Sequence, residues 1–208
     1  MPDLVLNRTP AAAVCVTHQL RAGAARVDIT PILGGPSGGY GIWGETTSGV
    51  WQRLFATALV IDDGEGGRVA LVGVDLHSGT RYLCERIAER TSPSVGITID
   101  RLILGATHTH CGPAGFYADH FYDRQAGSSK GFFDTVARRL AGRIALAIEQ
   151  AAAALQDARV GHADRPVWGW NQNRSFGAFR ANDGGTIVPR DFAREVGGTE
   201  PPAGLEDR

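Results

Sequence analysis

Runs of apolar residues along the chain predict a layered protein of strands and helices. Residues 24–29 form a short predicted strand that Thr30 and Pro31 end, since proline cannot donate a ladder hydrogen bond. Two longer apolar runs, 54–61 and 69–76, flank the polar, glycine-containing segment 62–67, which is typical of a β-hairpin. Both runs are nearly continuous rather than alternating, so we expect central strands covered on both faces.

The second half of the pattern adds helices. Residues 80–91 predict a helix with Leu83, Ile87 and Ala88 on its inner side, and residues 101–106 predict a buried strand. The clearest helix spans 131–156, where an apolar residue recurs every fourth position: Phe132, Val136, Leu140, Ile144 and Ile148. Residues 158–162 are interpreted as one more strand. The order indicates an α/β or α+β fold, with a mixed central sheet and flanking helices.

Composition narrows the classes of partner. The 208 residues carry a formal net charge of −1 and are 43% hydrophobic, so we expect a globular core and no field that recruits nucleic acid. No run approaches the roughly 20 apolar residues of a transmembrane helix. The apolar fragment 11–16 is a poor secretory signal, so the location stays unknown, with the cytoplasm as the default. Three cysteines without C-x-x-C spacing do not indicate a disulfide scaffold or a cysteine-rich zinc finger.

The glycine-dense segment 34–49 has two interpretations. Glycines let a backbone approach a ligand or another segment closely, so the segment could line a site. It could equally be a mobile surface loop. Composition alone leaves both open.

Candidate chemistry follows the strand at 101–106, in the sequence Thr-His-Thr-His-Cys-Gly-Pro at 107–113. In an extended backbone, His108 and His110 would point to the same side, and the end of a buried strand is a common place for functional groups. Neutral imidazole is a good zinc ligand. Thr107 and Thr109 are expected to fix the imidazole tautomers, and Gly112 starts a turn that leaves space before the rings.

Taken in order, several segments resemble the neutral/alkaline, non-lysosomal ceramidase family across about residues 22–180. They are Ala-Ala-Arg-Val-Asp-Ile-Thr-Pro at 24–31, Gly-Tyr-Gly at 39–41, Arg-Leu-Phe-Ala at 53–56, the run 69–76, Gly-Ala-Thr-His-Thr-His-Cys-Gly-Pro at 105–113, Ala-Ile-Glu-Gln-Ala at 147–151 and Asn-Arg-Ser at 173–175. The resemblance implies an N-terminal part of that family's catalytic domain at 23–180. Residues 1–22 are expected to be a poorly ordered extension, and 181–208 a linker or tail.

The resemblance also implies an activity and roles for three residues. The family hydrolyses the N-acyl amide bond of ceramide with zinc, and relatives are often secreted. By matching the family's motifs, His108 would ligate zinc, and His110 would stand beside the metal-bound water to move protons or hold substrate. Arg174 would face the same pocket, where a guanidinium suits a hydroxyl or a developing oxyanion.

The chain departs from the family pattern at two points. Cys111 stands where serine is usual, and it could be a tolerated small residue or a competing metal ligand. The family's further ligands, including a second histidine, and its essential serine segment have no counterpart in these residues, so a second polypeptide or a missing C-terminal part would complete the site. His77, His120 and His162 lie in no matching motif and are interpreted as ordinary residues.

Three hypotheses therefore follow from the sequence. The first is a zinc-dependent hydrolase of ceramide or a related lipid amide. The second is a non-catalytic fragment or interaction module derived from such a hydrolase. The third is a metal hydrolase of the same fold that acts on a different amide or ester.

Overall fold

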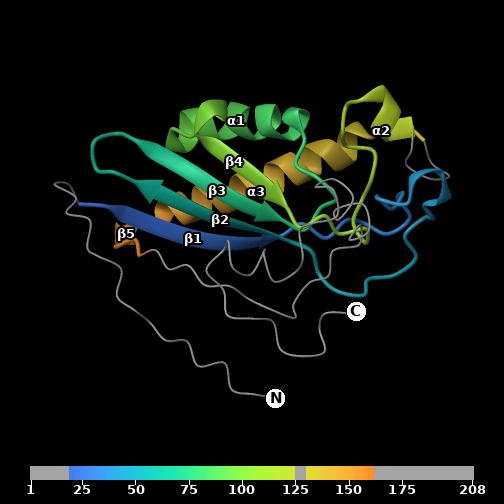
Figure 1. Cartoon of the computed structure of the whole chain (residues 1–208), viewed down its shortest axis with the longest axis horizontal. Coiled ribbons are helices and arrows are strands. Elements are labelled where there is room, and N and C mark those ends of the chain that lie inside the picture. Colours follow the sequence, from blue (N-terminus) through green and yellow to red (C-terminus); the bar gives the residue numbers. More distant parts are fainter. Residues whose placement is uncertain (1–18, 125–129, 162–208) are drawn as a thin grey trace, which may run out of the picture. The chain divides into compact units, whose positions relative to one another are not determined.

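The computed structural model describes residues 19–124 and 130–161 (Figure 1). Chain contacts divide the protein into two units, and the larger one comprises residues 15–159. The smaller unit, residues 1–14 and 160–208, lies almost entirely outside the described residues. The fold below is that of the larger unit.

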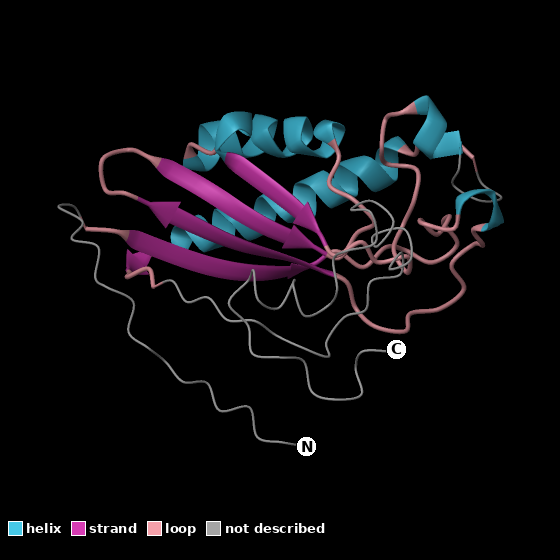
Figure 2. Cartoon of the chain, viewed as in Figure 1, coloured by secondary structure: helices cyan, strands magenta, loops and turns pink. Residues whose placement is uncertain are grey.

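Its centre is a five-stranded mixed sheet with the order β4-β3-β2-β1-β5. The strands are drawn in magenta in Figure 2. The pairs β1–β2, β2–β3 and β1–β5 are antiparallel, whereas β3 and β4 run parallel. The strand bounds are β1 Arg21–Asp28, β2 Phe55–Asp62, β3 Arg68–Val74, β4 Leu102–Ala106 and β5 Gln156–Asp157. The predicted mixed sheet with flanking helices is confirmed, including the hairpin of β2 and β3.

Two long helices accompany the sheet. Helix α1 (Arg81–Val95) begins after Thr80, whose side chain accepts a hydrogen bond from the Leu83 N–H, and it ends at Gly96 in the left-handed conformation. It therefore runs four residues past the predicted end. Helix α3 spans Asp134–Ala153. The short elements are α2 (His120–Arg124), η1 (Gly41–Trp43) and η2 (Ile99–Arg101).

The core lies between the sheet and these helices, with α3 packed across β1 and β2 and α1 packed beside α3 (Figure 1). Of the predicted stripe on α3, Leu140, Ile144 and Ile148 are buried, whereas Phe132 precedes the helix and is 39% exposed. In α1, the predicted inner residues Leu83, Ile87 and Ala88 are all buried. The 3.6-residue period thus identified the inner faces of both helices.

The predictions that β2 and β3 are covered on both faces and that β4 is buried are wrong for the described part of the chain. Burial alternates along β2 and β3, and Leu59, Leu71 and Ile103 stand 37%, 36% and 63% exposed. Alternation is the ordinary pattern of a sheet covered on one face. A continuous apolar run cannot reveal one-sided burial, because the inward-facing and the outward-facing positions of the strand then carry the same residue types.

The last strand also differs from its predicted position. Pairing with β1 falls on Gln156 and Asp157, opposite Ala22 and Arg21. Among residues 158–161 no strand forms, and His162 lies outside the described residues. β5 begins two residues after Ala154, the C-cap of α3, so the paired strand follows that helix directly.

A cross-strand ion pair closes the β2–β3 hairpin. Arg68 donates hydrogen bonds of 2.9 and 2.6 Å to Asp62, and the Gly64 N–H donates another of 2.8 Å. Asp62 is only 7% exposed. These bonds, that of Arg68 foremost, lower the pKa of Asp62 below its ordinary value of 3.8.

Asp62→Asn is expected to lower the free energy of unfolding at pH 7 by about 1–2 kcal/mol. Because the folded-state pKa lies below the unfolded one, this stabilisation is present above the unfolded value and is lost as the pH falls through the folded value. Urea unfolding at pH 7 and at about pH 3 measures the difference, which should shrink at the lower pH. Asp157→Asn, at an exposed position in β5, is the control. A pH-independent loss would contradict the role of the charge.

Candidate metal centre

The parallel pairing of β3 with β4 brings two loops to one edge of the sheet. Val74 pairs with Ala106 at the ends of the two strands. His77 follows the first strand by three residues, and His108 follows the second by two. Groups beyond the carboxyl ends of parallel strands commonly form the functional site in sheets of this kind.

Three imidazoles meet there: His77, His108 and His110. One candidate ligand nitrogen from each lies within 4.8 Å of the others. The ring centroids are 4.2 Å apart for His77 and His108, and 5.2 Å apart for His110 and each of the other two. His108 is exposed, whereas the other two are partly buried. Among the residues that the structure describes, this is the cluster that could hold a metal ion.

Hydrogen bonds orient two of the rings. His108 Nδ1 donates to the backbone carbonyl oxygen of His77 at 2.7 Å. A carbonyl can only accept, so this bond places the proton of neutral His108 on Nδ1 and leaves Nε2 as a lone-pair donor. His77 Nδ1 shares a 2.7 Å hydrogen bond with the Tyr117 hydroxyl. Such outer contacts fix ring orientation in metal sites.

The surroundings also shift two pKa values. Burial, followed by the neighbouring His108 and His110, lowers the pKa of His77 below 6.5. Burial raises the pKa of Tyr117 above 10.0, so its hydroxyl stays protonated at neutral pH. His77 is therefore held in the neutral form that binds metals.

The histidine pair does not have the predicted extended backbone. His108 has a φ of 61°, the left-handed region, which costs a non-glycine residue roughly 1–2 kcal/mol. The predicted proximity of the two rings nevertheless holds. Strained backbone of this kind is concentrated at functional sites.

The glycine-dense segment packs against the histidine loop. Gly38 donates a backbone hydrogen bond to Gly112 at 2.9 Å, and Ala114 donates one to Pro36 at 2.9 Å. Close backbone approach, one of the two interpretations of this segment, is therefore what the structure shows. Its Tyr40 also meets the His110 ring edge-on, with centroids 5.3 Å apart.

Gly39 makes room for His110. It has a φ of +95°, and a Cβ placed on it would lie 2.4 Å from Cγ of the His110 ring. Neither the backbone conformation nor the space suits a side chain. The His110 ring position thus depends on a glycine at this point.

We expect Gly39→Ala to displace the His110 ring and to lower the free energy of unfolding by at least about 1 kcal/mol. Gly34→Ala is the matched control, because Gly34 has a φ of +93° with nothing within 4 Å of its hypothetical Cβ. Both substitutions should destabilise, but the histidine ring resonances measured by NMR should shift only for Gly39→Ala. Equal shifts in both variants would contradict the contact.

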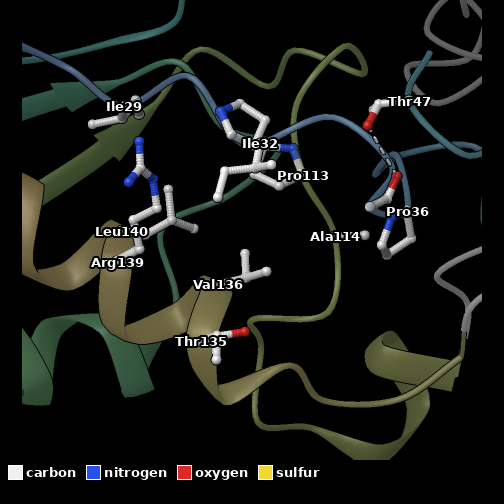
Figure 3. A pocket seen from close by; sticks show the side chains of 12 residues that line it. Ile29, Ile32, Pro36, Thr47, Pro113, Ala114, Thr135, Val136, Arg139 and Leu140 are labelled. Atoms are coloured by element: carbon white, nitrogen blue, oxygen red, sulfur yellow. Dashed lines mark hydrogen bonds between the residues drawn. The ribbon is translucent and has the colours of Figure 1, made fainter.

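Two pockets flank this region. A groove of about 270 Å³ is lined by His110 and Cys111 and by apolar residues such as Tyr40, Val50 and Trp51. Figure 3 shows a smaller pocket of about 110 Å³, between Ile29, Pro113 and the start of α3. No histidine lines the smaller pocket, so the groove beside His110 is the one that belongs to the cluster.

The structure places the predicted site residues as follows. His108 and His110 come together, whereas Arg174 lies outside the described residues. The Thr109 hydroxyl accepts from the Cys111 N–H at 3.2 Å, and a backbone carbonyl sets the tautomer of His108, so Thr109 does not set that tautomer as expected. The role expected of Thr107 stays a prediction. Cys111 is exposed and outside the cluster.

Of the histidines interpreted as ordinary, the structure separates two. His120 lies exposed at the start of α2, away from the cluster. His77 is part of the cluster, and the sequence interpretation missed it. The sequence did contain a signal for it. His77 comes just after the strand β3, and the helix α1 connects β3 to β4, the strand that precedes His108. Such a connection predicts parallel strands with adjacent ends.

A mixed sheet with a polar cluster beyond its parallel strand ends defines an α/β protein with a candidate metal centre. Residues 20–186 match the family model described as neutral/alkaline non-lysosomal ceramidase, N-terminal. The chain belongs to this family, a family of hydrolases, which confirms the resemblance seen in the sequence.

Individual relatives agree. The chain is 33% identical to neutral ceramidase A of Dictyostelium discoideum over 69% of its length and 20% of that protein's. It is 30% identical to the neutral ceramidase of Drosophila melanogaster, over 80% of its own length and 24% of that protein's. The crystal structure of neutral ceramidase from Pseudomonas aeruginosa matches 67% of this chain and 22% of that one, with a TM-score of 0.60 and 30% identity. The chain thus spans about a quarter or less of these relatives.

Proposed function

We propose that this chain carries part of the catalytic site of a zinc-dependent hydrolase that cleaves the N-acyl amide bond of ceramide or a related lipid amide. The products would be a fatty acid and a sphingoid base. The observation that carries the proposal is the convergence of His77, His108 and His110 in a family of ceramidases. Amide hydrolysis near neutral pH needs an activated water and a proton for the leaving amine, and imidazoles serve both needs.

The cluster fits zinc by donor type and by spacing. Zinc accepts imidazole nitrogen at roughly 2.0–2.1 Å, so two nitrogens of a tetrahedral site lie about 3.4 Å apart. The candidate nitrogens here lie at most 4.8 Å apart. Binding of the ion would need to draw these nitrogens together by at most about 1.4 Å.

In this proposal the residues have separate tasks. When bound, zinc lowers the pKa of a water to about 7 and polarises the amide carbonyl. His108 holds the ion through Nε2, because its Nδ1 is engaged with the His77 carbonyl. His110 moves the proton to the departing amine, since its ring borders the groove. Arg174 would hold the developing oxyanion.

The groove beside His110 supports a lipid substrate. Val50 and Trp51 on its wall are 53% and 97% exposed, and Tyr40 is 55% exposed. Apolar side chains next to the reactive groups offer a surface for an alkyl chain. Among the described residues, no helix combines the length and the apolar character needed to cross a bilayer.

A complete site needs ligands beyond His108 and its neighbours. We propose that a further polypeptide segment, the counterpart of the part of the relatives that this chain does not span, supplies them. The chain covers 22% of the solved Pseudomonas aeruginosa ceramidase, which supports this view. Three protein ligands with an open fourth position are the usual catalytic arrangement for zinc.

The test is an assay of fatty acid release. Purified, zinc-loaded chain is incubated with N-acylsphingosine, alone and together with a longer polypeptide that continues the family pattern. Release in either case, lost in the His108→Ala variant and on chelation, is the expected result. Release that chelation and His108→Ala leave unchanged, or its absence in both preparations, would contradict the proposal.

A further inference from the structure

We infer that His77 is a metal ligand and forms, with His108, the part of the zinc site that this chain itself supplies. The inference rests on the proposed function for the nature of the metal and deepens it by naming a second ligand. Neither the motif that identifies the family nor the spacing of the histidine pair includes His77. His77 joins the histidine cluster only through its position in the folded structure.

The first argument is proximity. The rings of His77 and His108 are the closest pair in the cluster, with centroids 4.2 Å apart and planes inclined by 36°. Two neutral imidazoles gain little from such an approach on their own, and two protonated ones would repel. A shared cation makes the arrangement favourable, because each ring presents a lone pair to it.

The second argument is orientation. In the tautomer that leaves Nε2 of His77 unprotonated, its Nδ1 donates to the Tyr117 hydroxyl oxygen, and Nδ1 of His108 donates to the backbone carbonyl of His77. Each ring is therefore left with Nε2 for a metal. Metal-binding histidines almost always have their other ring nitrogen engaged in this way.

The third argument is the support beneath Tyr117. The Asp123 carboxylate, only 4% exposed, accepts from the backbone N–H groups of Tyr117 at 3.0 Å and Asp119 at 3.2 Å. The Tyr117 ring also stacks on the fully buried Phe116, with centroids 4.7 Å apart. The tyrosine is thus fixed from two sides, and with it the ring of His77.

His110 differs from both. In the part of the chain that the structure describes, its ring makes no hydrogen bond, and it meets Tyr40 and the backbone of Gly39 instead. A ring without such an engaged nitrogen can take up and release a proton at either position. This difference assigns metal binding to His77 and His108, and leaves His110 for proton transfer.

The experiment uses cobalt(II), which replaces zinc and reports its ligands by absorption. All variants carry Cys111→Ser, so that the exposed thiol beside the site cannot contribute. His77→Ala keeps the backbone carbonyl that orients His108 and removes only the imidazole. It is expected to weaken cobalt binding at least about tenfold, whereas His120→Ala should leave binding unchanged.

His77→Cys provides the readout that a merely structural role would not give. A thiolate bound to cobalt produces a charge-transfer band in the near ultraviolet, and the Cys111→Ser parent supplies the baseline. The band is expected in the His77→Cys chain. Its absence, or unchanged cobalt affinity in His77→Ala, would overturn the inference.

The two proposals fail separately. A thiolate band without fatty acid release in any preparation would overturn the proposed function and support His77 as a ligand. Fatty acid release without the thiolate band would support the proposed function and overturn His77 as a ligand. Tyr117→Phe, which removes the hydrogen bond to His77 but keeps the stacked ring, is expected to weaken cobalt binding about tenfold. Unchanged binding in this variant would count against the assigned orientation of His77.

Discussion

Replacing His108 with alanine is expected to weaken zinc binding at least about 100-fold, which corresponds to about 2.8 kcal/mol. The reason is that, among the histidines that the structure describes, His108 has its Nδ1 bound to a backbone carbonyl at 2.7 Å, which leaves its Nε2 free for the ion. The alanine variant loses that donor outright. Isothermal titration with zinc measures the affinity, and fatty acid release in the completed enzyme should fall below detection.

The fold itself should not respond to this change. His108 is exposed, and surface substitutions usually alter the free energy of unfolding by less than about 0.5 kcal/mol. His120→Ala, at another exposed histidine outside the cluster, is the matched control and should retain full affinity. Equal zinc affinity in the two variants would show that the metal is bound elsewhere.

Truncating Phe116 to alanine is expected to lower the free energy of unfolding by about 3–5 kcal/mol. Its side chain is fully buried. The alanine variant leaves a cavity in the segment between the histidine loop and α2. Because native domains are stable by about 5–15 kcal/mol in total, this is a large share. Urea unfolding followed by circular dichroism measures it.

Two further variants make this second result decisive. Phe121→Ala, at a position 64% exposed, should change stability by less than about 0.5 kcal/mol. Phe116→Leu fills most of the cavity, so it should cost less than Phe116→Ala and remain folded enough for a zinc titration. Comparable losses in Phe116→Ala and Phe121→Ala would contradict the packing described for this segment.

The elements of the fold were largely accessible from the sequence, because they depend on local patterns. The hairpin of β2 and β3 followed from two apolar runs around a polar turn. Helix α3 followed from apolar residues at every fourth position. Which face of the sheet is covered could not be predicted, because Leu59 and Leu71 on the exposed face are as apolar as the buried Ala58 and Val72.

The site was predicted only in part, for a different reason. His108 and His110 belong to one short motif, so adjacency in sequence was enough to group them. His77 lies more than thirty positions earlier, and only the parallel pairing of β3 with β4 brings it to the same edge. The left-handed backbone at His108 had no sequence signal, since glycine and asparagine are the usual residues there.

The predicted role of Arg174 depends on residues beyond the described part of the chain, so it stays a prediction. The domain boundaries at 22 and 180 also stay predictions. For Cys111, the exposed position at the groove and outside the histidine cluster agrees better with a tolerated small residue than with a competing ligand.

The most direct test of the metal centre is an anomalous difference map from crystals of the zinc-loaded chain, recorded at the zinc absorption edge. The expected result is one strong peak beyond the ends of β3 and β4, at roughly 2.0–2.1 Å from a ring nitrogen of His108 and of His77. A map with no peak at these rings, or with its strongest peak at other residues, would contradict a zinc site in this position.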